Sequence, residues 1–118
     1  MDVGVDIVEI HRIAKQIKNP RFLTRVYSAQ EVTYCRARKN SAQHFAVRFA
    51  AKEAVWKAIA GASKQGALSL LHRDIQVKNE TSGKPHVVLP GRFSNLAKRV
   101  RISLSHGEDY AVAVAIVQ

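Results

Sequence analysis

Two acidic residues stand in stretches of sequence that are otherwise apolar or basic. Asp6 lies within the apolar residues 3–8, and Glu53 is the only acid in residues 48–57. The whole chain is strongly basic, with 19 Lys and Arg, 9 Asp and Glu and a formal charge of +10. Because an unpaired buried carboxylate is costly, such acids are normally paired or bound to metal. Brought together by folding, they would form an oxygen site suited to Mg²⁺, with phosphate oxygens and water as further ligands.

Cations flank one of these acids. Arg48 and Lys57 lie about one helical turn to either side of Glu53, so all three could contact one phosphorylated ligand. His106, in a polar turn near the end of the chain, could contact a phosphate or transfer a proton. Simpler interpretations stay open: an i,i+4 ion pair of Glu53 with Lys57, a helix N-cap at Asp6, and a solvated loop histidine.

The element that must carry Glu53 is a long central helix over residues 41–60. Weak capping signals at Asn40 and Gln43 predict its start, and Gly61 predicts its end. One side is bulky and apolar and the other is small, so we expect a buried helix with its long polar side chains reaching out at the edges. The bulky side comprises Phe45, Phe49, Trp56 and Ile59, the small side Ala46, Ala50, Ala54 and Ala58, and the polar edge Arg48, Lys52, Glu53 and Lys57.

The remaining patterns alternate between strand and helix periods. Residues 1–8 predict a strand, placing Asp6 at a junction with a helix that ends at Asn19-Pro20. Ser28 and Glu31 form a capping box that predicts a helix to about residue 38. We expect a loop over residues 61–73, a hairpin of residues 74–78 and 86–89, a short helix near residues 93–97, and strands at 100–104 and 110–117.

The final strand is the clearest of these, and its two faces differ. One face carries Tyr110, Val112, Val114 and Ile116; the other carries Ala111, Ala113 and Ala115, which invites close helix packing. The order of elements indicates an α+β fold in which an antiparallel sheet packs against the long central helix and shorter helices. The length of 118 residues predicts one domain, residues 1–118.

Composition indicates the cellular compartment and the class of partner. The single cysteine, Cys35, excludes an internal disulfide and a multi-cysteine metal site, which fits a reducing compartment. No signal pattern is present, and no apolar run approaches the roughly 20 residues that span a bilayer. We therefore expect a cytoplasmic protein with no membrane partner. The charge of +10 favours a polyanionic partner or substrate.

Four segments in order resemble one family across nearly the whole chain, the bacterial holo-acyl-carrier-protein synthases, which are small phosphopantetheinyl transferases. The segments are Val5-Asp6-Ile7-Val8-Glu9-Ile10-His11-Arg12-Ile13, Arg48-Phe49-Ala50-Ala51-Lys52-Glu53-Ala54, Ser82-Gly83-Lys84-Pro85, and Ser103-Leu104-Ser105-His106 with Tyr110-Ala111-Val112-Ala113. This chain departs from the usual family pattern at Val47, at Ala60-Gly61-Ala62 and at Gly107. None of these departures removes a charged group.

The resemblance implies a reaction and a fold. Enzymes of this family, with the 4′-phosphopantetheinyl transferase fold, move 4′-phosphopantetheine from coenzyme A to a serine of apo acyl carrier protein. They require Mg²⁺, release adenosine 3′,5′-bisphosphate and activate the carrier for fatty acid biosynthesis. Asp6 and Glu53 correspond to the metal ligands and catalytic residues. The general base stays open among Glu53, Asp6 and a metal-bound water.

The resemblance also assigns binding residues. Arg48, Lys57 and His106 correspond to the coenzyme A site, with Pro85 and Ser105 shaping its nucleotide pocket. A second group, Arg12, Lys15, Arg21 and Phe22, lies on the surface expected to receive the acidic carrier protein. The family implies a homotrimer with active sites between neighbouring subunits.

Two alternatives remain at this point: a basic nucleic-acid-binding module and a metal-dependent nuclease. The first explains the charge but predicts a basic stripe with exposed aromatic residues, whereas Phe45, Phe49 and Trp56 are expected in the core. The second would use Asp6 and Glu53 as metal ligands. Protection by coenzyme A with Mg²⁺ would favour the transferase, and salt-sensitive DNA binding would favour either alternative.

Overall fold

The computed structural model describes all 118 residues, as five strands, six α-helices and two short 3₁₀ helices. The first half of the chain runs β1 (Asp2–Glu9), α1 (Ile10–Gln16), α2 (Pro20–Val26), α3 (Ala29–Arg36) and α4 (Ser41–Ala62). The second half runs α5 (Lys64–Leu68), η1 (His72–Asp74), β2 (Gln76–Asn79), β3 (Pro85–Val88), η2 (Gly91–Phe93), α6 (Ser94–Ala97), β4 (Val100–His106) and β5 (Tyr110–Val117). The α+β class predicted from the sequence is confirmed.

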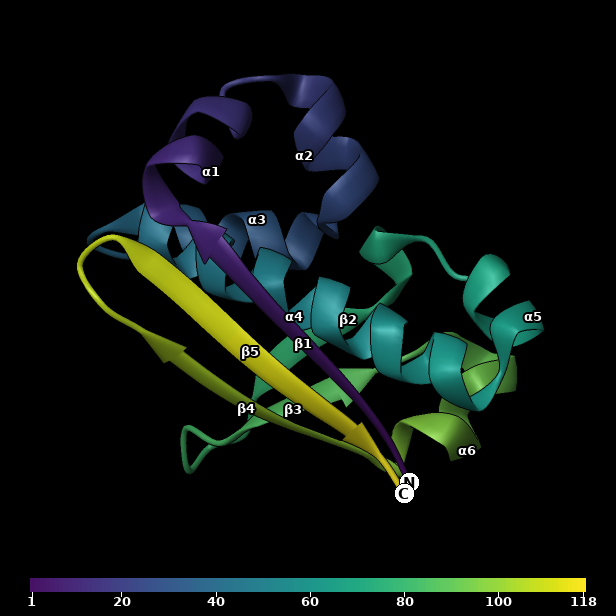
Figure 1. The fold of residues 1–118 in the computed structure, drawn as a ribbon. Coiled ribbons are helices and arrows are strands. Elements are labelled where there is room, and N and C mark those ends of the chain that lie inside the picture. The colour runs from purple at the N-terminus through teal and green to yellow at the C-terminus, as the bar shows by residue number, and fades with distance from the viewer.

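The main sheet has three antiparallel strands in the order β1-β5-β4. Its middle strand, β5, is the last element of the chain and pairs with the first, so that Asp2 lies opposite Val117 and the two termini lie side by side (Figure 1). The strands β2 and β3 form a separate antiparallel hairpin.

The long helix α4 packs closely on one face of the main sheet. The alanines of β5 form this contact, and Ala111, Ala113 and Ala115 are fully buried, which confirms the prediction from their alternation. On β1, a Cβ atom added to Gly4 would overlap the carbonyl oxygen of Ala54 and lie 2.8 Å from the nitrogen of Ala58. Small residues on both elements therefore allow helix and sheet backbones to approach.

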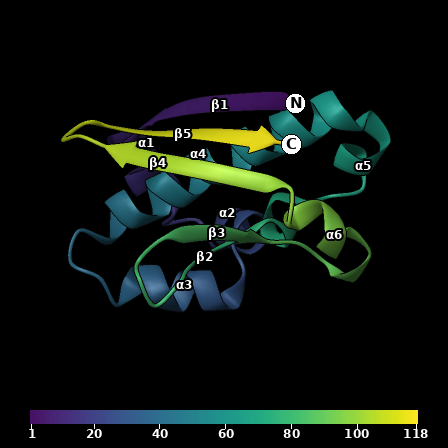
Figure 2. The ribbon, with the colours of Figure 1, turned by 90° about the horizontal axis from the view of Figure 1, so that it is seen from below.

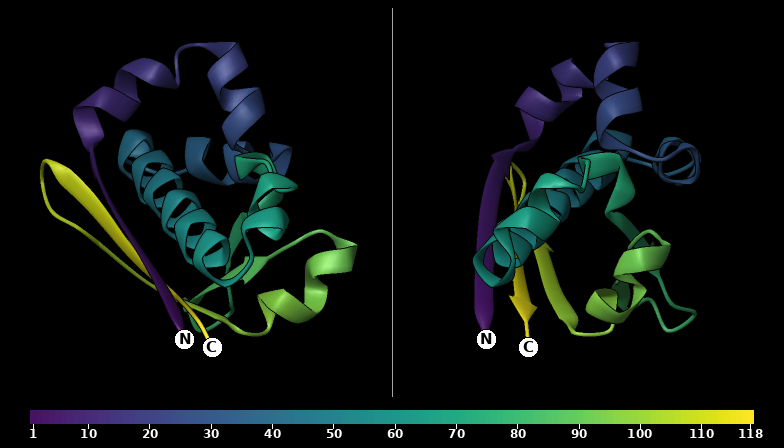
Figure 3. Two further views of the ribbon diagram at one scale, coloured as in Figure 1. Left: turned by 45° about the vertical axis from the view of Figure 1, so that its right-hand side comes forward. Right: turned by 90° about the vertical axis from the view of Figure 1, so that its right-hand side faces the viewer.

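Helix α4 is also covered on its other side. In Figures 2 and 3 the helix lies between the main sheet and a second layer that contains α3 and the β2–β3 hairpin. The core includes Phe45 and Ile59 of α4, which are buried, while Phe49 and Trp56 pack against it partly exposed. No helix in the chain combines the length and the apolar character needed to cross a membrane.

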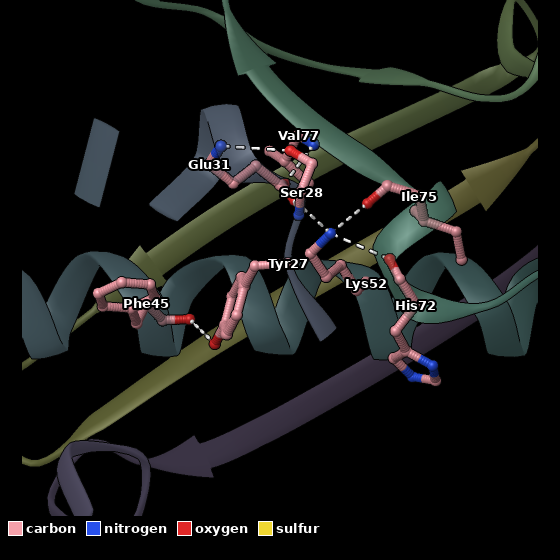
Figure 4. A network of polar contacts seen from close by, with 8 residues as sticks. All are labelled: Tyr27, Ser28, Glu31, Phe45, Lys52, His72, Ile75 and Val77. Carbon is pink, nitrogen blue, oxygen red and sulfur yellow. Dashed lines mark hydrogen bonds and ion pairs between the residues drawn. The ribbon is translucent and has the colours of Figure 1, made fainter. Parts of the chain in front are cut away.

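A buried ion pair joins α4 to this second layer (Figure 4). Lys52 Nζ lies 2.7 Å from Glu31 Oε1 and also donates to the carbonyl oxygens of Ile75, at 2.7 Å, and His72, at 3.0 Å. Glu31 accepts further hydrogen bonds from the backbone N–H groups of Ser28 and Val77. The expectation that Arg48 and Lys52 reach solvent at the helix edge was wrong, since both are buried. For Lys52, these acceptors satisfy the ammonium group inside the protein.

Several predicted boundaries held and others did not. Ser28 and Glu31 form the capping box of α3 as predicted. Asn40 makes no side-chain cap; its backbone is left-handed, with φ of 57°, before α4 begins. The helix continues through Gly61 to Ala62. Asp6 is no N-cap, because β1 runs on to Glu9, which occupies that position.

Candidate functional site

Asp6 and Glu53, hereafter the acid pair, come from the two most tightly packed elements. Asp6 is on the face of β1 that meets α4, since Gly4 and Val8 on the same face are buried while Val5 and Ile7 are exposed. Glu53 is in the middle of α4. The negative charge of Glu53 contributes to raising the pKa of Asp6, so the fold brings the two carboxylates within electrostatic reach. Both side chains are partly open to solvent.

Each acid has its own cationic or hydrogen-bonding partner. Lys57 Nζ lies 3.3 Å from Asp6 Oδ1 and donates to the carbonyl oxygen of Val5 at 3.2 Å. His72 Nε2 lies 3.0 Å from Glu53 Oε1. The expected i,i+4 pair of Glu53 with Lys57 is replaced by these two contacts. Lys57 thus bridges the helix and the strand.

The two carboxyl groups have different electrostatic environments. Burial raises the pKa of Asp6, and this effect exceeds the opposing hydrogen bond and positive charge of Lys57. The hydrogen bond from His72 lowers the pKa of Glu53, with the charges of His72 and Lys57 acting in the same direction. Glu53 is therefore held ionised to lower pH than an ordinary glutamate.

The acid pair has the donor chemistry that Mg²⁺ requires. Both residues offer carboxylate oxygens, and Asp6 Oδ2 and Glu53 Oε2 have no hydrogen-bond partner in the protein. A cation between them would relieve the repulsion from Glu53, which adds to the effect of burial in raising the pKa of Asp6. The structure contains no cluster of three or more His, Cys, Asp or Glu side chains that could hold a metal ion. Two carboxylates suit Mg²⁺, which commonly takes its other ligands from substrate phosphates and water.

A second site on α4 is cationic. A cavity of about 310 Å³, hereafter the Arg48 cavity, is lined by residues from α3, α4, the hairpin and β4, among them Tyr34, His44, Arg48, Pro85, Leu104 and His106. Arg48 is almost fully buried, makes no ion pair, and its Nε atom has no partner. Its guanidinium group lies 4.2 Å from the centroid of the Tyr34 ring. An unpaired buried cation in a cavity is a strong indication of an anion site.

Further basic groups surround the Arg48 cavity. Arg38 lies over the same Tyr34 ring, at 4.1 Å from its centroid. Gln43 Nε2 contacts His106 Nδ1 at 2.8 Å. Burial lowers the pKa of His44, and the positive charges of Arg48, Arg38 and His106 lower it further. No acid lines this cavity, so a bound phosphate would be the neutralising charge.

The structure brings most of the predicted coenzyme A residues to this cavity. Arg48, Pro85 and His106 line it together. Lys57 instead lies at the acid pair. Ser105 is exposed and, by the alternation of β4, points to the opposite face of the sheet from His106. Within one chain, Ser105 is thus separated from the other predicted residues.

The predicted carrier-protein residues fall into two groups. Arg12 and Lys15 of α1 and Arg21 of α2 are exposed cations, and the charge of Arg12 also lowers the pKa of Asp6, so this surface adjoins the acid pair. Phe22 is almost entirely buried and stacks on Phe49 with the ring centroids 5.9 Å apart. Its edge borders a hollow of about 560 Å³ that Glu53 also lines.

Sequence reasoning missed several members of the site. His72 reaches Glu53 from 19 residues away, and Tyr34 reaches Arg48 through the packing of α3 on α4, while His44 precedes Arg48 by one turn of α4. Arg25 and Arg73 border the hollow beside Glu53. Residues 61–73 predicted a loop with at most one helical turn around residues 67–71, whereas α5 occupies Lys64–Leu68; nothing local indicated that His72 would meet the central helix.

Comparison with known proteins gives the class. Residues 2–115 match the family model of the 4′-phosphopantetheinyl transferase superfamily, and the chain belongs to that superfamily. Holo-[acyl-carrier-protein] synthase of Koribacter versatilis is 40% identical over 125 residues, covering 100% of this chain and 98% of the relative. The corresponding protein of Moorella thermoacetica is 41% identical over 124 residues, covering 100% and 94%.

Solved structures agree with these relatives. Holo-[acyl-carrier-protein] synthase of Neisseria meningitidis superimposes with a TM-score of 0.83 at 27% identity, covering 99% of this chain and 97% of the other. That of Helicobacter pylori, in complex with coenzyme A, gives a TM-score of 0.79 at 30% identity, covering 98% and 99%. Within the superfamily, the chain is an enzyme of the holo-[acyl-carrier-protein] synthase type, as the resemblance implied.

Proposed function

We propose that the chain transfers 4′-phosphopantetheine from coenzyme A to a serine of apo acyl carrier protein, with Mg²⁺ required. The observation that carries the proposal is the arrangement on α4, where Glu53 of the acid pair and the buried Arg48 lie little more than one turn apart. Carboxylates for a metal and, at a separate site on the same helix, an unpaired cation for phosphate suit a substrate with several phosphate groups. The Helicobacter pylori structure, a complex with coenzyme A, supports the same substrate.

The reaction is a phosphoryl transfer. The serine oxygen of the carrier protein forms a bond to the phosphorus that bears the pantetheine. The bond between that phosphorus and the bridging pyrophosphate oxygen breaks, and adenosine 3′,5′-bisphosphate leaves. The serine proton passes to a base, for which the carboxylates of Asp6 and Glu53 are the protein candidates. The enzyme needs no nucleophile of its own, because positioning and charge neutralisation supply most of the catalysis.

The residues form two sites with different roles, one at the acid pair and one at the Arg48 cavity. Asp6 and Glu53 would hold Mg²⁺, whose charge would neutralise the pyrophosphate oxygens as the leaving group departs. Lys57, beside Asp6, adds a second positive charge at the same place. Arg48 and His106 would bind the phosphate on the adenosine ribose in the Arg48 cavity, with Pro85 at its wall. The product carrier protein would serve fatty acid biosynthesis.

We also propose a homotrimer. The face of the main sheet that α4 leaves uncovered is apolar: Val3, Val5 and Ile7 of β1 are 66, 56 and 65% exposed, and Val112, Val114 and Ile116 of β5 adjoin them. A contiguous apolar face of this kind favours contact with further copies of the chain. Ser105 points to this same face, so a neighbouring subunit would be the one to meet it.

Mass spectrometry of an apo carrier protein tests the reaction. The carrier is incubated with this enzyme, coenzyme A and Mg²⁺, and a parallel sample contains EDTA. We expect a metal-dependent gain of about 340 Da, the mass of the phosphopantetheine group transferred. No gain with several carrier proteins, in a sample of folded enzyme with Mg²⁺, would contradict the proposal. Nothing specific in the structure favours nucleic-acid binding, since Phe45 is buried and Phe49 and Trp56 pack against the core.

A further inference from the structure

The contact between His72 and Glu53 is the only hydrogen bond that the Glu53 carboxylate makes. It joins His72 Nε2 to Oε1 at 3.0 Å, while Oε2 has no partner in the protein. Both side chains are about one-third exposed, so neither is fixed by burial alone. A long acidic side chain on a helix surface has several rotamers, and one directed hydrogen bond selects among them.

The backbone of His72 is anchored by the buried ion pair. Its carbonyl oxygen accepts from Lys52 Nζ at 3.0 Å and from the backbone N–H of Ile75 at 3.1 Å. Lys52 is fully buried and is fixed in turn by Glu31 and by the carbonyl of Ile75. Figure 4 shows the His72 carbonyl turned towards Lys52 and its imidazole pointing to the other side. The ring also stacks on Phe49, at 26° between planes and 6.5 Å between centroids.

We propose that His72 is a positioning residue for the metal site: by holding Glu53 Oε1 it leaves Oε2 free as the oxygen that would bind Mg²⁺. This rests on the proposed function, because it takes Glu53 as a ligand of Mg²⁺. The η1 turn then positions His72 and, through it, the metal ligand Glu53. Lys52, one residue before Glu53, holds this turn in place by binding the carbonyl oxygen of His72. Outer partners of this kind fix ligand orientation and strengthen metal binding.

Two substitutions separate the hydrogen bond from the shape of the ring. His72→Phe keeps a planar ring on Phe49 and removes the donor, whereas His72→Gln keeps a donor close to the position of Nε2. Isothermal titration calorimetry with Mg²⁺, on enzyme saturated with coenzyme A and without carrier protein, measures metal affinity apart from turnover. We expect His72→Phe to weaken Mg²⁺ binding about tenfold and His72→Gln to stay near wild type.

The same variants are then assayed for transfer over a range of Mg²⁺ concentrations. His72→Phe should need more metal for half-maximal rate and recover most of the wild-type kcat when Mg²⁺ is saturating. A residue that served only the fold would not shift the metal requirement. Thermal unfolding checks that each variant is folded, and His72→Leu is a second donor-free variant in case the phenylalanine disturbs the turn.

Two results would overturn the inference. One is wild-type Mg²⁺ affinity in both donor-free variants, and the other is equal weakening in His72→Phe and His72→Gln. Wild-type enzyme that binds Mg²⁺ but transfers no phosphopantetheine would instead contradict the proposed function, and the calorimetric comparison would still decide the role of His72.

Discussion

Asp6 and Glu53 carry the same functional group in opposite environments. Burial raises the pKa of Asp6, and the hydrogen bond from His72 lowers that of Glu53. The difference arises because burial outweighs the Lys57 hydrogen bond at Asp6, whereas the His72 hydrogen bond outweighs burial at Glu53. At the scale of single residues, the proposed chemistry therefore depends on groups that the carboxylates contact as much as on the carboxylates themselves.

Glu53→Gln tests the metal assignment. The amide keeps the size of the side chain and its carbonyl oxygen can still accept from His72, but the negative charge is lost. Even outer partners of a metal contribute 10–100-fold, so loss of a direct ligand should lower Mg²⁺-dependent transfer at least about 100-fold. The unfolding midpoint should change little. A fully active Glu53→Gln enzyme would rule out Glu53 as a required ligand.

Cys35 gives a prediction about pH. It is fully buried, and burial raises the pKa of its thiol from 9.0 to about 11. The unfolded chain therefore loses this proton first, so the contribution of Cys35 to stability is full below pH 9 and is lost as the pH rises towards 11.

The same burial should make Cys35 unreactive. We expect Ellman's reagent to label it at pH 8 only when urea unfolds the chain, because the native thiol is both protonated and inaccessible. Rapid stoichiometric labelling of the native protein would contradict the buried position.

Among the elements, α4 connects every part of the proposed site. Its alanines meet the sheet, Lys52 fixes η1, Glu53 joins the acid pair and Arg48 enters the cationic cavity. Two lysines of this helix, Lys52 and Lys57, both pair with acids, but the first is fully buried and the second is about half exposed.

These two lysines make a matched comparison. Lys52→Met leaves Glu31 buried without its cation and should lower the free energy of unfolding by about 3–5 kcal/mol. Lys57→Met removes an exposed pair and should cost about 1 kcal/mol or less. Urea unfolding followed by circular dichroism measures both. Similar small losses in the two variants would show that the buried pair contributes little net stability.

The elements were largely predictable from sequence, and the contacts between them were not. The alanine face of β5 and the capping box of Ser28 with Glu31 depend on local spacing, and both were predicted correctly. The burial of Lys52 depends on acceptors 20 to 23 residues away, which no local pattern reveals. Gly61 was predicted to end the central helix, but α4 continues one residue further, to Ala62.

The same distinction applies to the candidate site. Asp6, Glu53 and Arg48 were identifiable because their charges conflict with apolar surroundings. His72 and Tyr34 were missed because a histidine in a loop and a tyrosine in a short helix are unremarkable until the fold brings them to Glu53 and Arg48. The orientation of Ser105 followed only once the register of β4 was known.

For the molecule as a whole, the exposed positive charge near the acid pair and the exposed apolar surface lie on different parts of the protein. The exposed cations of α1 and α2 adjoin the acid pair, while the uncovered apolar face lies on the main sheet. A basic chain with this division can use one surface for an acidic partner and another for copies of itself.

Arg12→Glu tests the first surface. Reversing the charge should raise the KM for the acidic carrier protein about tenfold or more and leave the KM for coenzyme A nearly unchanged. Arg92→Glu, on the exposed η2 turn, makes the same charge change elsewhere and serves as the control. Equal increases in both KM values for Arg12→Glu would argue against a separate docking surface.

Val5→Lys tests the second surface. We expect light scattering to give wild-type enzyme a mass three times that of the 13.1 kDa chain, and Val5→Lys a smaller one, because a charge is costly in an apolar interface. Gln65→Lys, on the exposed surface of α5, is the matched control. A monomeric wild-type enzyme would contradict the trimer.

The position of β5 in the middle of the main sheet has a consequence for how the molecule is made. The first strand, β1, hydrogen-bonds only to β5, which is formed by residues 110–117. During synthesis β1 therefore has no strand to pair with until residues 110–117 have left the ribosome. Pairing across such a sequence separation is slow because a long loop must close first. The acid pair, with one member on β1, thus takes shape only after β5 has emerged and paired with that strand.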